Sequence, residues 1–178
     1  MTNEELLTLA KNCGFDHVGM LNTAALEFNP AVRDMCAADR CRSYGRCWTC
    51  PPGCGTLEEI SRRAAAYRRG VLLQSTGEME DDFDVETMMD TEKRQKDRFM
   101  AFVTLVRDLH PDCLPMASGA CTLCADCTYP DAPCRFPHLA IPSMEAYGLV
   151  VSQVCEGSGL PYYYGPKTMT YTSCVLID

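Results

Sequence analysis

The densest run of thiols in the chain is ACTLCADCTYPDAPCRFP, which begins at Ala120. Its spacing, C-x2-C-x2-C-x6-C, supplies four candidate ligands: Cys121, Cys124, Cys127 and Cys134. Three thiolates at successive three-residue steps let a tight loop present sulfur to three irons of a cubane, and backbone N–H groups then point at its sulfides. A tetrahedral zinc ion usually takes two separate C-x2-C pairs. The run therefore favours a [4Fe-4S] cluster, and leaves open whether Cys134 shares the cluster of the other three.

A second run of thiols precedes it and includes the segment YGRCWTCPPGCG. Its glycines permit the positive φ angles that a chain needs when it wraps closely around a ligand. Trp48 can cover such a site and keep water from it, which matters because solvent exposure tunes a cluster. An iron–sulfur cluster is the first interpretation, with zinc and free thiols as alternatives. The candidates, spaced C-x4-C-x5-C-x2-C-x3-C, are Cys36, Cys41, Cys47, Cys50 and Cys54.

Composition narrows the possible classes of protein. Thirteen cysteines in 178 residues is an odd count, and the N-terminal residues are acidic and amphipathic, so an exported disulfide framework is disfavoured. The net charge of -8 would repel a phosphate backbone, which argues against nucleic acid as a partner. No window is apolar enough for a membrane helix. We expect a soluble, cytoplasmic protein.

Helical and strand patterns alternate around the two cysteine runs, which favours an α/β layer fold. Capping-box residues and helical periodicity predict helices over 3–13, 56–69, 85–110 and 143–157. Apolar and β-branched runs predict strands over 15–21, 71–76 and 113–118, and at the C-terminus. The expected architecture is one layered domain over 1–178, with the runs inserted as metal-binding loops over 36–55 and 119–138.

Four cysteines stand apart from the two runs. The predicted elements place Cys13 and Cys155 in helices and Cys174 in the last strand, where a thiol usually packs as a small apolar group. Cys113 falls at a junction between a helix and a strand, and no role is assigned to it. The three histidines form no recognisable catalytic arrangement.

Two motifs of the chain resemble a known family of predicted metal-binding proteins, domain-of-unknown-function family 2284. The first is YGRCWTCPP, and the second joins CTLCADC and CRFP to the predicted helix SMEAYG. The resemblance leaves Cys47 and Cys54 outside the family's pattern. It implies seven metal ligands: Cys36, Cys41, Cys50, Cys121, Cys124, Cys127 and Cys134. The opening KNCGFDHVGM is also similar to epoxyqueuosine-reductase-like proteins, which pair a corrinoid-binding α/β domain with two [4Fe-4S] clusters.

Three functions follow as hypotheses. In the first, the chain holds one or two [4Fe-4S] clusters and serves in electron transfer or as a redox accessory protein, and its acidic surface docks on a basic redox partner protein. In the second, a cluster or a corrinoid supports a redox enzyme that acts on a small molecule. In the third, zinc supplies folding energy to a binding module.

Overall fold

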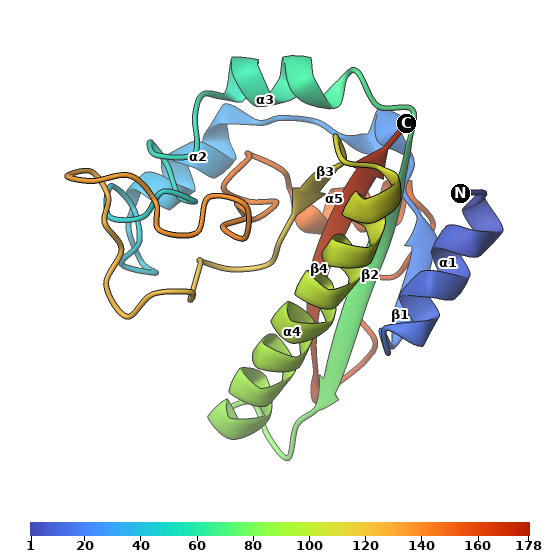
Figure 1. Ribbon diagram of the computed structural model, residues 1–178. Coiled ribbons are helices and arrows are strands. Elements are labelled where there is room, and N and C mark those ends of the chain that lie inside the picture. Colours follow the sequence, from blue (N-terminus) through green and yellow to red (C-terminus); the bar gives the residue numbers. More distant parts are fainter.

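A four-stranded antiparallel sheet forms the middle layer of the protein (Figure 1). The computed structural model describes all residues from 1 to 178. The strands lie in the order β1-β2-β4-β3. The two long central strands pair along their whole length, from Arg69 opposite Ile177 to Glu78 opposite Thr168. The strands are β1 (His17–Met20), β2 (Arg69–Glu78), β3 (Leu114–Met116) and β4 (Thr168–Ile177).

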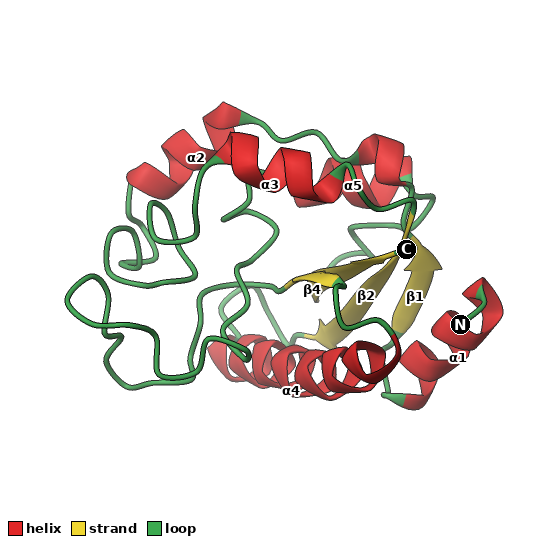
Figure 2. Ribbon diagram, turned by 45° about the horizontal axis from the view of Figure 1, so that its top comes forward, coloured by secondary structure: helices red, strands yellow, loops and turns green.

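Helices cover both faces of this sheet, so the domain has three layers (Figure 2). Side chains alternate along a strand, and on β2 Val71 and Leu73 face one core while Leu72 faces the other. One face is covered by α1 (Asn3–Asn12) and α4 (Val85–Leu109), and the other by α3 (Leu57–Ala64) and α5 (Val151–Gly157). The expected α/β layer fold is confirmed, and burial on both faces explains the continuous apolar run of β2.

Local capping signals determine where several helices begin. Both halves of the capping box are present at Thr2 with Glu5 and again at Thr56 with Glu59. Asp84 accepts a hydrogen bond from the backbone N–H of Thr87 at 3.0 Å and caps α4. The helix predicted over 56–69 ends earlier, at Ala64, because β2 begins at Arg69.

The helix predicted over 143–157 is wrong in its first half. Only α5 is helical; residues 144–148 form turns, flanked by isolated β-bridges at Ser143 and Leu149. The Ser143 hydroxyl accepts a hydrogen bond from the N–H of Ala146 at 3.1 Å. Gly148 has a φ of +83° and approaches Leu57 so closely that an added Cβ would lie 2.6 Å from its side chain. A residue with a left-handed backbone conformation ends a helix. The chain at Gly148 therefore turns back over α3 instead of continuing as a helix.

Two short elements were not predicted from the sequence. The 3-10 helix η1 spans Thr23–Ala25, and α2 spans Pro30–Ala37. Asn29 caps α2 and Pro30 is its first residue, a combination that favours a helix start. Because Cys36 lies in the last turn of α2, the first cysteine-rich loop is shorter than the expected 36–55.

The two cysteine-rich loops project side by side from one end of the sandwich, beyond α2 and β3 (Figures 1 and 2). Residues 38–56 and 119–138 contain no helix or strand. Their backbones are therefore held by turns and by contacts between the loops. None of the helices combines the length and the apolar character that a bilayer crossing requires.

Candidate metal centre

Trp48 joins the two cysteine-rich loops. Its indole N–H donates a hydrogen bond to the carbonyl of Ala132 at 3.1 Å. Its ring also packs edge to face against Tyr129, with ring centroids 4.9 Å apart. An aromatic pair of this geometry adds about 0.5–1.5 kcal/mol to the burial of its surface. The expected shielding residue is therefore also a structural link between the loops.

Gly53 lets the loops approach each other closely. A Cβ added there would lie 2.8 Å from the carbonyl oxygen of Cys47 and 2.9 Å from the ring of Tyr129. These distances leave no room for a side chain. The glycine is needed for close packing, which the sequence alone indicated only in general terms.

Five cysteines line one small cavity of about 20 Å³ between the loops. Four of them are the predicted set of the second run, which the fold brings together: Cys121, Cys124, Cys127 and Cys134. The fifth is Cys47, from the first run, whose sulfur lies 3.3 Å from the hydroxyl of Thr49. The family pattern had left Cys47 unassigned. No local signal could have placed it here, because the contact joins segments far apart in the chain.

Two of the remaining cysteines of the first run, Cys36 and Cys54, lie on the turn formed by SMEAYG. The Cys36 thiol lies 3.9 Å from the carbonyl oxygen of Glu145, and the Cys54 thiol lies 3.6 Å from that of Ala146. These carbonyls belong to adjacent residues. Cys54, which the family pattern also left unassigned, thus shares its surroundings with Cys36.

Cys41 and Cys50 complete this second group. Burial is the main cause that raises the pKa of Cys50 to about 12, and the nearby thiols of Cys47 and Cys41 add to it. Burial also raises the pKa of Cys36, with a further contribution from Cys41. Cys41 itself is exposed, whereas Cys50 is buried. Five of the nine cysteines thus surround one cavity, and the other four lie beside it, with Cys50 next to Cys47.

Arg33 places a positive charge beside the group of four. Burial raises the pKa of Cys54, and the Arg33 guanidinium opposes that rise. The guanidinium is fixed by a hydrogen bond to the carbonyl of Gly55 at 3.0 Å, and its Nε is buried without a partner in the chain. A cation here stabilises thiolates, which are the forms that bind metals.

Backbone N–H groups act similarly on the group of five. Burial would raise the pKa of Cys127, but hydrogen bonds from the backbone of Tyr129, Trp48 and Thr128 and from the Cys47 thiol together lower it. Burial raises the pKa of Cys121, and a backbone hydrogen bond from Leu123 opposes this. Such hydrogen bonds stabilise the thiolate, which is the form of cysteine that binds a metal.

The donor set fits a thiolate-bound metal centre. Five thiols and no histidine or carboxylate line the cavity, and soft thiolate ligands select zinc, copper(I) or iron–sulfur clusters. Leu123 and Phe136 supply an apolar wall. The thiols surround the cavity, and no group of three His, Cys, Asp or Glu side chains has the arrangement that would hold a single ion.

The isolated cysteines lie elsewhere, as predicted for Cys155 and Cys174. Both are fully buried in the core between the sheet, α3 and α5. Cys13 follows the last residue of α1 and packs against the opposite core. Cys113, which had no assigned role, is buried just before β3 and lines a separate, larger cavity.

Comparison with known proteins identifies the family of the chain. A family model described as "Predicted metal-binding protein (DUF2284)" matches residues 19–177, which is nearly the whole chain. No curated protein and no solved structure matches this chain significantly. The match covers both cysteine groups and the turn that carries Glu145 and Ala146.

Proposed function

Because the chain belongs to this family of predicted metal-binding proteins, we propose that it is an iron–sulfur protein with one or two [4Fe-4S] clusters that serves in electron transfer or as a redox accessory protein. The observation that carries the proposal is the gathering of Cys47 with the four cysteines of the second loop around one cavity. The C-x2-C-x2-C spacing within that group supports a cubane over a closed zinc site.

Each cysteine group would hold one centre. The second loop supplies Cys121, Cys124, Cys127 and Cys134, with Cys47 as a further thiol on the same cavity. Beside it, the second centre would use Cys36, Cys41, Cys50 and Cys54. A bound iron–sulfur cluster supplies one-electron transfer at a potential set by its hydrogen bonds and its exposure to water.

The surrounding residues are suited to control that exposure. Trp48, Leu123 and Phe136 line the cavity and would exclude water from one side of it. The exposed Cys41 leaves the other group nearer to solvent. Electrons could then enter or leave on the side of Cys41, because transfer to another protein requires a short path to the surface.

The charge of the chain supports a protein partner. The net charge is -8, and acidic surfaces attract basic patches over distances up to about one Debye length, roughly 8 Å at physiological salt. We therefore propose a basic redox partner that binds weakly and with electrostatic steering. High salt should slow the association.

A zinc-stabilised binding module is the second candidate. The cavity of about 20 Å³ is close to the size of a single ion, since about 10–15 Å³ already accommodates one water molecule. The thiols would have to move closer together to bind that ion, because no three of them are arranged to hold one. A cubane is larger, so its binding would require the two loops to move apart. Zinc would supply folding energy without redox chemistry.

Metal analysis of the anaerobically purified protein tests these candidates. We expect a brown protein with about four irons for one cubane or about eight for two, and equal sulfide. Cys124→Ser should lower iron and sulfide content. Cys155→Ser, a buried thiol outside both groups, should leave them unchanged. A colourless protein with stoichiometric zinc would overturn the iron–sulfur proposal.

A further inference from the structure

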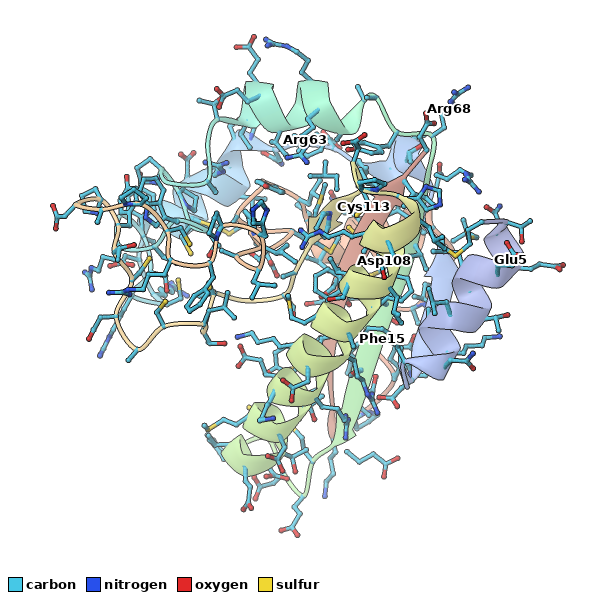
Figure 3. The ribbon with its side chains drawn as sticks, viewed as in Figure 1. Glu5, Phe15, Arg63, Arg68, Asp108 and Cys113 are labelled. Atoms are coloured by element: carbon cyan, nitrogen blue, oxygen red, sulfur yellow. The ribbon has the colours of Figure 1, made fainter.

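The largest cavity near the metal centre contains none of the nine clustered cysteines. It measures about 420 Å³ and lies between α3, the last turn of α4, β3 and the segment that follows Cys134. Figure 3 shows Arg63 on the side of α3 that faces Cys113. Four prolines contribute to its walls: Pro111, Pro115, Pro137 and Pro142. Proline fixes φ, so these walls are rigid.

Two unpaired arginines line this cavity. Arg63 and Arg107 form no ion pair, and no carboxylate is among the lining residues. The only hydrogen bond of the Arg107 guanidinium to oxygen goes to the carbonyl of His138. Five of the twelve arginines are paired with acidic residues, namely Arg46, Arg62, Arg68, Arg94 and Arg98. The other seven, Arg63 and Arg107 among them, form no ion pair. The cavity is thus a cationic site in a protein of net charge -8.

Tyr147 and Cys113 also line the cavity and can donate hydrogen bonds. Burial raises the pKa of Tyr147 to about 12, so its phenol keeps its proton. Burial also raises the pKa of Cys113; Arg107 and Arg63 partly oppose the effect, while the nearby carboxylate of Asp112 adds to it. Two guanidinium groups and two protonated donors are complementary to an oxyanion. Guanidinium groups bind carboxylate and phosphate oxygens through paired, charge-assisted hydrogen bonds.

This cavity shares a wall with the metal centre. Pro137, Ala140 and Pro142 also line a smaller cavity whose other walls include Trp48 and Cys134. The segment that contains Pro137, Ala140 and Pro142 would therefore separate a molecule bound between the arginines from the group of five thiols. The site is independent of which metal those thiols hold.

We propose that this cavity binds a small anion, whose carboxylate or phosphate oxygens lie between Arg63 and Arg107 and accept a hydrogen bond from Tyr147. The cavity of about 420 Å³ is large enough for a molecule the size of a small metabolite and too small for a folded protein. This proposal goes beyond metal binding, because it assigns the chain a second ligand, a small anion, at a separate site.

Isothermal titration calorimetry of the metal-loaded protein tests the proposal, with inorganic phosphate and citrate titrated to millimolar concentration at constant ionic strength. We expect saturable binding of at least one probe; the probe that binds identifies the phosphate or the carboxylate class. Arg63→Gln should weaken it by about tenfold or more, as expected for a charge-assisted contact. Its control is Arg62→Gln, because Arg62 is exposed and paired with Glu58 at 2.6 Å.

Arg107→Gln should weaken binding similarly, and circular dichroism will show whether loss of its contact with His138 alters the fold. Metal content should remain that of the wild type in Arg63→Gln, so a failure of this inference is separable from a failure of the metal proposal. If neither probe binds saturably, or if Arg63→Gln and Arg62→Gln bind equally well, the anion site is refuted.

Discussion

The indole N–H of Trp48 donates a hydrogen bond to the carbonyl of Ala132, 84 residues further along the chain. This bond ties the segment of Cys47 to the loop of the other four cysteines. Trp48→Phe removes the donor, and we expect a loss of about 1 kcal/mol in the free energy of unfolding. Metal should also leave the protein faster in the presence of a chelator.

Urea denaturation and the rate of metal release measure these two effects. Tyr129→Phe is the matched control, since it keeps the ring that packs against Trp48 and should change stability by less than about 0.5 kcal/mol. Equal release rates for Trp48→Phe and the wild type would show that the bond does not hold the loops together.

Close packing at Gly53 gives a second prediction. Gly53→Ala places a methyl group 2.8 Å from the carbonyl oxygen of Cys47, and overpacking of this kind costs about 1–3 kcal/mol. Metal content should fall with it. Gly19→Ala is the control, because its added methyl meets Leu160 at an ordinary 3.5 Å. The idea fails if the two variants have the same stability and metal content.

Removal of the metal should affect the loops far more than the sheet. Residues 38–56 and 119–138 lack helices and strands, so metal ligation would supply much of their stability. Hydrogen exchange after anaerobic chelation should show faster exchange in both loops. The central strands β2 and β4, which pair over ten residues each, should keep their protection. Unchanged exchange in the loops would contradict a structural role for the metal.

Burial of Tyr147 predicts a dependence of stability on alkaline pH. The unfolded phenol ionises near pH 10 and the folded one near 12, so stability falls as pH rises through this interval. At about pH 11 the wild type should have lost roughly 1.4 kcal/mol more than Tyr147→Phe, relative to their values at neutral pH. Urea denaturation at neutral pH and at about pH 11 measures this difference. An equal loss of unfolding free energy in the wild type and in Tyr147→Phe would contradict the prediction.

The sequence alone determined the features that depend on neighbouring residues. Capping boxes at Thr2 and Thr56 located two helix starts, and the apolar run of β2 indicated a strand buried on both faces. The spacing of the second cysteine run gave four thiols that the fold does bring to one cavity. These signals act over a few residues, so they can be recognised before the chain is folded.

Only the tertiary structure decided which segments meet. It placed Cys47 with the second loop, changed SMEAYG from a predicted helix into the turn beside Cys36 and Cys54, and put Cys113 in a cavity with Arg63 and Arg107. Most of these contacts join residues far apart in sequence, such as Cys36 with Glu145, and they depend on how both segments pack on the sheet. Local propensity carries no information about such packing, and this is why the sequence could name the thiols but could not group them.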